Sequence, residues 1–246
     1  MEPLASFGNT KSSFNTNLSR FISLTLTDVN ANEIPLRTTD DEPFEIHIPR
    51  DPNLILPPMT LQNVTSITNS TSSPHYYLFN SHYVNLKEMS HVSVHFELHP
   101  LTANLSYLLI YKFDGLPILN SSIQQIDGWT IFCPFSKQFF CCDHEKLACI
   151  SFSDLSNEGL FSYFIDNQKT FNHQSIIFGI RELNSTEVMQ SCSNSSTIIP
   201  PITDERFSFT SDYEIRVYTS ACLYLDKNNQ WKSDGLRVTN WPRNVH

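Results

Sequence analysis

Alternating apolar and polar positions mark several short β-strands along the chain. In residues 90–99, apolar side chains occupy every second position from Val92 to Leu98, with polar side chains between them. This period of two is typical of a strand that has one face in a core. Residues 105–113 are almost continuously apolar, which indicates a central strand.

Further short apolar runs are separated by turn-forming residues. These strand candidates are residues 21–26, 44–48, 126–132, 148–152, 160–165, 175–180 and 207–209. Many short strands with Asn-, Ser- and Pro-rich turns between them predict an all-β fold, a twisted β-sandwich. Helical periodicity is weak throughout, and only residues 153–160 fit a short helical turn. Residues 60–75 are polar and rich in Ser and Thr, and are expected to form a linker or loop.

The last alternating stretch runs from Glu214 to Leu225 and places its odd positions toward a core. A polar turn follows it. Within this stretch and after the turn lie Tyr218, Thr219, Ser220, Cys222, Tyr224, Trp231, Gly235 and Leu236. In type and spacing these residues resemble the opening of the GPS motif in the GAIN domain of the polycystin family, the polycystin-one-like and egg-jelly-receptor proteins. Residues 48–52, Ile-Pro-Arg-Asp-Pro, resemble a second landmark that these proteins carry upstream.

The resemblance implies the domain organisation of this family. A Ser/Thr/Pro-rich, irregular segment over residues 1–74 would precede a sandwich similar to GAIN subdomain B over residues 75–238, and residues 239–246 would form a divergent tail. In the family, the motif continues into a further cysteine and a His-Leu-Thr tripeptide where the chain cleaves itself. Neither follows Val238. We therefore expect no self-cleavage and a sandwich incomplete at its C-terminal strand, whose open edges favour aggregation.

Two residues of the motif have expected structural roles. The family partner of Cys222 lies in the later part of the motif, so we expect Cys222 to be unpaired, or paired with Cys192 if the fold permits. Trp231 is expected to cover the end of the sandwich and to donate its indole N–H to a backbone carbonyl.

The composition is that of one large domain, or one domain and a tail, with a packed core. The chain has 246 residues, of which 40% are hydrophobic and 12% aromatic. These fractions argue against a disordered chain. A formal net charge of −9 without a basic cluster excludes nucleic acid as a partner.

Glycosylation sequons and cysteines favour an oxidising, extracellular environment. The seven Asn-x-Ser/Thr sequons begin at Asn17, Asn63, Asn69, Asn104, Asn120, Asn184 and Asn194. The six cysteines are Cys133, Cys141, Cys142, Cys149, Cys192 and Cys222. In such a compartment they are expected to form disulfides, with fifteen possible connectivities for three bonds. No signal peptide and no transmembrane helix is evident, so we expect a piece of a longer protein, with an alternative or mispredicted gene product as the other interpretation.

Two clusters are candidate metal sites. His91, His95 and His99 would share one face of a helix, but the alternation predicts a strand, on which four residues span about 13 Å and cannot share one zinc ion. We expect a solvated strand face there. The densest cysteine cluster consists of Cys133, Cys141, Cys142 and Cys149, with Asp143 and His144 among them, and would suit a zinc knuckle. Local disulfides are the preferred interpretation, because paired Cys-x-x-Cys spacing is absent.

Motifs of common enzyme classes are missing. The sequence contains no Gly-x-Ser-x-Gly, no glycine-rich nucleotide loop and no His-Glu-x-x-His. The acidic residues Asp40, Asp41 and Glu42 precede a proline and are expected to be solvated. We therefore expect no catalytic activity and no cofactor or metal, with a metal-dependent enzyme as a remote third alternative.

The leading hypothesis is an extracellular, non-catalytic fragment of a polycystin-type membrane receptor. The resemblance implies a link to calcium or cation channel function and a role in sensing or adhesion at the extracellular face of the plasma membrane or cilium. The implied partners are the missing C-terminal strand, the transmembrane region and a polycystin channel subunit. The alternative is a stand-alone secreted β-sandwich that mediates adhesion or ligand binding.

Overall fold

The computed structural model describes residues 28–32, 34, 46, 55–65, 78–86, 92–134, 159–193, 199–226, 228, 230–233 and 235–237. The chain divides into two compact units between Leu56 and Pro57. In the first unit, the Asp28 carboxylate accepts hydrogen bonds from the backbone N–H groups of Asn30 and Asn32 and thereby closes a turn. The sheets all belong to the second unit.

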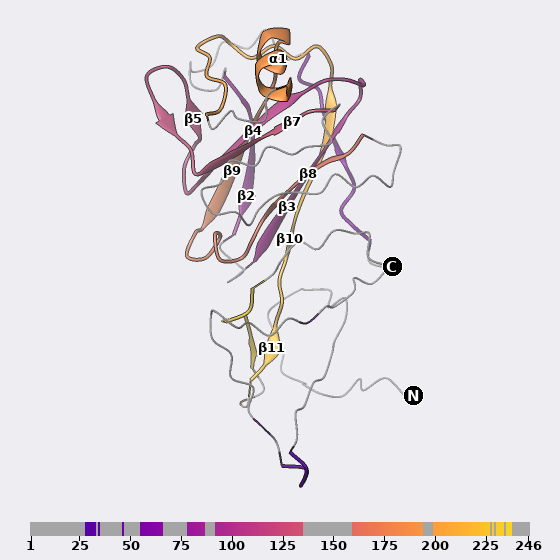
Figure 1. Ribbon diagram of the computed structural model, residues 1–246, viewed down its shortest axis with the longest axis vertical. Coiled ribbons are helices and arrows are strands. Elements are labelled where there is room, and N and C mark those ends of the chain that lie inside the picture. Colours follow the sequence, from indigo (N-terminus) through magenta and orange to yellow (C-terminus); the bar gives the residue numbers. More distant parts are fainter. Residues whose placement is uncertain are drawn as a thin grey trace. The chain divides into compact units, whose positions relative to one another are not determined.

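Two antiparallel four-stranded sheets form the second unit (Figure 1). The first sheet has the order β1-β10-β3-β8 and contains β1 (Thr60–Gln62), β10 (Tyr213–Ser220), β3 (Ser93–Pro100) and β8 (Phe161–Ile165). The second has the order β2-β9-β4-β7 and contains β2 (Asn80–Asn85), β9 (Ser175–Glu182), β4 (Tyr107–Phe113) and β7 (Gly128–Phe132). This architecture confirms the predicted all-β fold.

Aromatic side chains fill the space between the two sheets. Phe96 of the first sheet lies 4.9 Å from Phe178 of the second, measured between ring centroids. Tyr107 contacts both Phe161 and Tyr213 across the same interface. Large rings bury much apolar surface and favour tilted or edge-to-face contacts, so they hold the sheets together as a sandwich.

The outer face of the second sheet carries a third layer. Helix α1 (Ser185–Ser193) and the hairpin of β5 (Ile118–Leu119) and β6 (Gln124–Gln125) pack against it. Buried Leu108, Ile110 and Trp129 form the sheet side of this contact. Because both faces of β4 are covered, all its residues from Tyr107 to Tyr111 are buried, and the central strand predicted here is confirmed.

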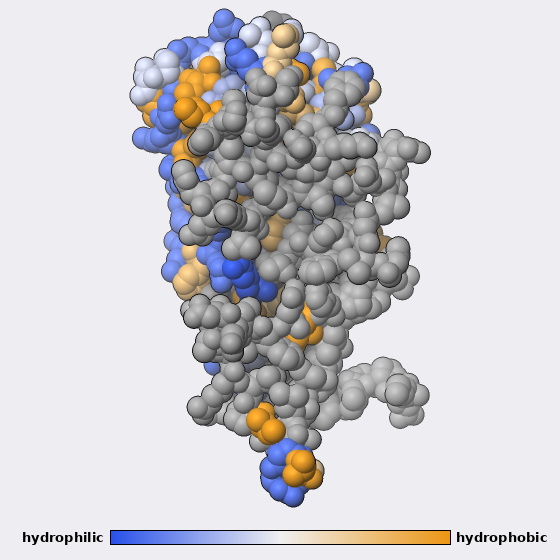
Figure 2. All heavy atoms as spheres, in the orientation of Figure 1, coloured by the Kyte–Doolittle hydropathy of each residue, from blue (hydrophilic) through white to orange (hydrophobic). Residues whose placement is uncertain are grey.

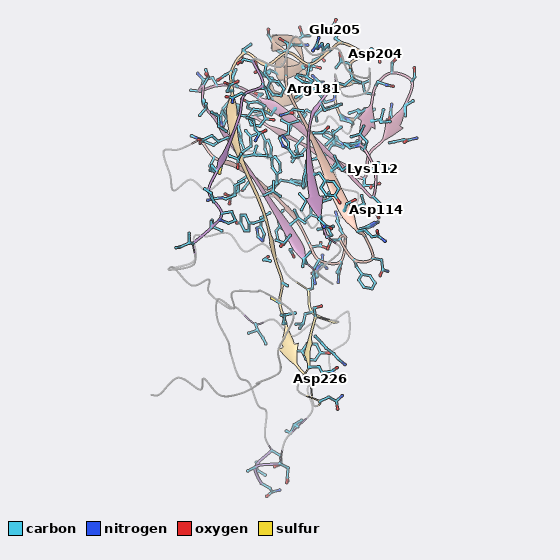
Figure 3. All side chains as sticks on the ribbon, turned by 180° about the vertical axis from the view of Figure 1, so that it is seen from behind. Lys112, Asp114, Arg181, Asp204, Glu205 and Asp226 are labelled. Atoms are coloured by element: carbon cyan, nitrogen blue, oxygen red, sulfur yellow. A yellow bond between two sulfur atoms is a disulfide. The ribbon has the colours of Figure 1, made fainter. Side chains whose placement is uncertain are left out.

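The sandwich has two ends that differ in what they carry. At one end β3 leads into β4, β9 leads into α1 and β10 begins, and Thr102 is hydrogen-bonded to Ser211. We call this end the capped end. At the opposite end β2 stops, β9 starts and β8 passes into the loop of residues 166–174. Figure 1 shows α1 and β5 near the first of these ends, and Figure 3 shows Asp204 and Arg181 near it, with Asp114 toward the other.

Most predicted strands in the described parts of the chain are confirmed. The alternating residues 90–99 overlap with β3, and the candidates at residues 105–113, 126–132, 160–165 and 175–180 overlap with β4, β7, β8 and β9. The long strand expected from Glu214 to Leu225 instead ends at Ser220, opposite the first residue of β3. Two residues of the same stretch, Tyr224 and Leu225, form β11 and pair with β12 (Trp231–Lys232).

Two other predictions were wrong, and several further candidates lie outside the described residues. Residues 207–209 form no strand, because Phe209 is buried through ring contacts with Phe207 and Tyr213 rather than through backbone pairing. Residues 60–62, expected in a linker, pair with β10 as β1. The candidates at residues 21–26 and 148–152, most of 44–48 and most of 153–160 lie outside the described residues.

Candidate functional site

Strand β10, which carries the first residues that resemble the GPS motif, begins with a partly buried hydrogen-bond network at the capped end. Tyr213, the first residue of β10, is fully buried, and its hydroxyl accepts a hydrogen bond of 2.6 Å from Nδ2 of Asn80. The same hydroxyl lies 3.1 Å from Nε2 of His82, which accepts its proton when the imidazole is neutral. Burial lowers the pKa of His82 to about 4. Since Asn80 and His82 belong to β2, this network ties the first residue of β10 to the other sheet.

Acidification is expected to destabilise the protein through His82. The folded pKa of about 4 lies below the ordinary value of 6.5. The unfolded chain therefore binds the proton more tightly, so stability is intact above pH 6.5 and falls as the pH drops toward 4. The full difference between these two pKa values corresponds to a loss of roughly 3 kcal/mol in the free energy of unfolding. Urea unfolding at several pH values should show a shallower fall between these limits for His82→Gln than for the parent protein.

His99→Gln is the matched control, because His99 is partly exposed and lies 3.1 Å from Glu214 on the outer face of the first sheet. An unchanged pH dependence in His82→Gln would contradict the role assigned to His82.

The outer face of β10 and β3 carries a buried charged group. Glu97 is 1% exposed, and its carboxylate accepts hydrogen bonds from Nε and Nη2 of Arg216 and from the Tyr218 hydroxyl. Arg216 also donates to the carbonyl oxygen of Pro57. The expectation of a solvated face is therefore wrong at Glu97, because the register places Arg216 directly opposite it and neutralises its charge.

His95 is a cross-strand packing partner of two motif residues. Its ring is stacked on Tyr218 with a centroid distance of 4.6 Å, and its Nε2 lies 2.8 Å from Oγ of Ser220. A serine hydroxyl on an imidazole is also the geometry of a nucleophile beside its base. Here the two residues are diagonal neighbours on paired strands, and the stacked ring is clamped further by Phe164. We interpret the pair as a structural link that fixes the end of β10.

A tight hairpin follows β10. Asp226 accepts hydrogen bonds from the backbone N–H groups of Asn228 and Gln230, and its other oxygen lies 2.9 Å from Nζ of Lys232. The backbone hydrogen bond from Gln230 and the lysine ammonium lower the pKa of Asp226 to about 2. The carboxylate therefore stays ionised and closes the turn between β11 and β12.

The segment after this hairpin returns to the sandwich. Gly235 has a φ of 75°, which a glycine adopts without strain. The carbonyl oxygen of Leu236 then accepts a hydrogen bond of 2.7 Å from Nδ2 of the buried Asn167. Arg237 lies 3.6 Å from the Asp166 carboxylate. Both anchors come from the loop after β8, so residues 221–237, which we call the terminal segment, are docked at the opposite end of the sandwich.

Removing the Asn167 anchor is expected to loosen the terminal segment without unfolding the sandwich. Asn167→Ala removes a hydrogen bond to the backbone, which is worth about 1 kcal/mol. Amide hydrogen exchange at residues 230–237 should become faster, while exchange in β3 and β4 stays slow. Gln168→Ala is the matched control, since Gln168 is exposed and its hydrogen bonds to Asp166 and Phe171 are made by backbone groups that alanine keeps. Equal exchange in both variants would show that Asn167 does not hold the segment.

The structure contains a disulfide that joins the third layer to the second sheet. Cys133, directly after β7, is bonded to Cys192 of α1. The suggested pairing of Cys222 with Cys192 is therefore wrong, and Cys222 is a free, half-buried thiol whose pKa is raised by burial. Cys141, Cys142 and Cys149, with Asp143 and His144, lie outside the described residues.

The structure describes only some of the remaining predicted site residues. His91 and the sequons at Asn17, Asn69 and Asn194 lie outside the described residues, as does the Trp231 side chain. Asn63, Asn104 and Asn184 are exposed and Asn120 is half-buried. Among the described residues, no group of three or more His, Cys, Asp or Glu side chains is arranged to hold a metal ion. In the same part of the chain, every helix is too short or too polar to cross a membrane.

Several residues of the site were not singled out in the sequence. Asn167 is the partner of Leu236 of the motif. Asn80 and His82 are the partners of Tyr213 at the start of β10, and they lie in a polar stretch whose alternation is weak. The Asp-Asn pair directly after the apolar run of β8 was a turn signal that marked residues 166–167.

Comparison of the chain with models of protein families, with curated proteins and with solved structures gives no match. The relationship to the polycystin family therefore stays a prediction from the residues of the motif.

Proposed function

We propose that the chain is a non-catalytic extracellular module of a polycystin-type membrane receptor that is linked to calcium or cation channel function. In this proposal the sandwich is the sensing part, and the terminal segment leads from it toward the rest of the receptor. A ligand or a pulling force that displaces the segment would be transmitted along the chain.

The observation that carries the proposal is the docking of the terminal segment on the loop after β8. Leu236 is held by a neutral hydrogen bond and Arg237 by an ion pair whose arginine side chain is 36% exposed. Contacts of these two kinds are each worth about 1 kcal/mol or less. The sandwich, by contrast, is closed by a core of buried aromatic rings. The segment can therefore leave under conditions in which the two sheets stay together.

The disulfide of the third layer and the exposed sequons support an extracellular location of this module. The Cys133–Cys192 disulfide is stable in oxidising compartments such as the cell exterior. Four of the sequons lie in exposed or half-exposed turns, where an attached sugar would not disturb the core.

The proposal is tested by surface labelling of cells that produce the endogenous protein. A membrane-impermeant biotin reagent, followed by detergent extraction, should recover peptides of this chain from the labelled membrane fraction. Recovery from the culture medium alone would favour the stand-alone secreted module. Recovery from unlabelled cytosol with reduced Cys133 and Cys192 would refute an extracellular role.

A further inference from the structure

The four sequons in the described parts of the chain gather at one end of the sandwich. Asn63 follows β1, whose last residue is paired with Tyr213 at the start of β10. Asn104 lies in the turn from β3 to β4, and Asn184 lies between β9 and α1. Asn120 is at the tip of the β5–β6 hairpin, where the neighbouring Ser121 donates its backbone N–H to Asp204. The strand pairings and the contact with Asp204 place all four positions at the capped end, near which Figure 1 shows α1 and β5.

Asparagine itself is not confined to the capped end. At the opposite end or beyond it lie Asn85, Asn167, Asn172 and Asn228. None of these four has Ser or Thr two positions later, so none is a sequon. The segregation therefore concerns the complete acceptor tripeptide and does not follow from a general richness of turns in asparagine.

In two of the sequons, the asparagine side chain makes its contacts through Oδ1 and leaves Nδ2 available for attachment of a sugar. Oδ1 of Asn184 accepts the backbone N–H of Glu187 as the N-cap of α1, at 3.0 Å. Oδ1 of Asn120 accepts the N–H groups of Ser122 and Ile123. In both residues the oxygen makes the structural contact, so a sugar on Nδ2 leaves the turn intact.

The hydroxyl groups of two sequons are engaged in the folded chain. Ser106, which completes the Asn104 sequon, is 2% exposed. Thr65, which completes the Asn63 sequon, donates its hydroxyl to Asp212 at 2.8 Å. An enzyme that needs this hydroxyl must act before the chain folds, and folding then collects the modified residues at one end.

We infer that Asn63, Asn104, Asn120 and Asn184 carry N-linked oligosaccharides that cover the capped end and leave the opposite end, with the docked terminal segment, uncovered. In the reaction, Nδ2 bonds to the anomeric carbon of an oligosaccharide carried on a lipid pyrophosphate. The bond from that carbon to the pyrophosphate oxygen breaks, the lipid pyrophosphate leaves, and Nδ2 loses a proton to the enzyme's base. The inference rests on the proposed extracellular function, because the donor is met on the secretory route.

Exposed apolar side chains at both ends can report which end the oligosaccharides shield from solvent. Leu101 is 50% exposed and Met189 is 70% exposed at the capped end, where Figure 2 shows apolar residues among polar ones. Phe171 at the opposite end is 45% exposed, and Tyr224 beyond it is 36% exposed. Oligosaccharides at the capped end would shield the first pair and leave the second pair unchanged.

The test uses the full chain of residues 1–246, produced behind a cleavable signal peptide in mammalian cells. Enzymatic removal of the sugars in ¹⁸O water labels each occupied asparagine, and peptide masses should show the label at Asn63, Asn104, Asn120 and Asn184. Hydroxyl-radical footprinting should then show Met189 and Leu101 becoming more reactive after sugar removal, with Phe171 and Tyr224 unaltered. Gln174→Thr completes a sequon at Asn172 and is the matched control, which should add protection at Phe171.

The outcomes separate this inference from the proposed function. Secreted protein that lacks sugar at the four sites, or an equal gain in reactivity at both ends, would overturn the inference and leave an extracellular module standing. Full occupancy in a chain that the cells retain internally would support the inference and count against the proposed function.

Discussion

Replacing Arg181 by methionine is expected to lower the free energy of unfolding by about 3–5 kcal/mol. Nη1 and Nη2 of Arg181 bind the two oxygens of Glu187 at 2.8 and 2.6 Å, and Nη2 also donates to the carbonyl of Pro201. The two side chains are only 5% and 11% exposed. Burial alone would raise the pKa of Glu187, but the guanidinium and the backbone N–H of Asn184 lower it. Without Arg181, the buried carboxylate of Glu187 in α1 loses the opposite charge that neutralises it.

A double variant identifies the cause of that loss. Arg181→Met with Glu187→Gln removes both charges and keeps the hydrogen bonds of the capping box at Asn184. Urea unfolding should show that the double variant regains most of the lost stability. Lys112→Met, which breaks a partly exposed pair with Asp127 at 3.9 Å, should change stability by about 0.5 kcal/mol or less. A double variant as unstable as Arg181→Met would contradict the account.

Removing the disulfide is expected to cost about 4 kcal/mol, because the bond closes a loop with a sequence separation of 59 residues. Replacing Cys133 and Cys192 by alanine frees α1 from the end of β7, so amide exchange in residues 185–193 should also accelerate. Equilibrium urea unfolding measures the loss. Cys222→Ala is the control, since Cys222 is free and half-buried. Its replacement should change the free energy of unfolding by less than about 1 kcal/mol. Equal stabilities of the two variants would show that the bond contributes nothing.

The strands with clear apolar patterns were predictable from the sequence. β3, β4, β8 and β9 each bury at least one continuous or alternating apolar face, and that pattern fixes both their type and their inward face. β2 was not predictable in this way, because its sequence Asn-Ser-His-Tyr-Val-Asn is mostly polar and its place depends on pairing with β9.

The helix was missed although a local signal was present. The weak apolar pattern of α1 hides it, but Asn184 followed three residues later by Glu187 is a capping pair that marks a helix start. The partner of this pair, Arg181, lies outside the helix, so the buried ion pair required the fold. The same holds for Cys133 and Cys192, whose pairing no spacing rule predicts.

The interactions around the motif depended on register. Tyr218 and Ser220 were recognised as motif residues, but their contact with His95 follows from the alignment of β10 with β3. Glu97 alternates with core residues and was therefore expected in solvent. It is buried because Arg216 occupies the opposing position on the neighbouring strand. A sequence pattern assigns a side chain to a face of the sheet, whereas its partner across the strands is set by tertiary structure.

The most direct test of the central claim is mass-spectrometric peptide mapping of the endogenous, surface-labelled protein without reduction. The account predicts a cross-linked peptide that contains Cys133 and Cys192, together with peptides beyond Arg237 that lead toward a membrane-spanning region. Reduced Cys133 and Cys192, or the absence of this chain from the surface-labelled fraction, would contradict the claim that it is an extracellular module of a membrane receptor.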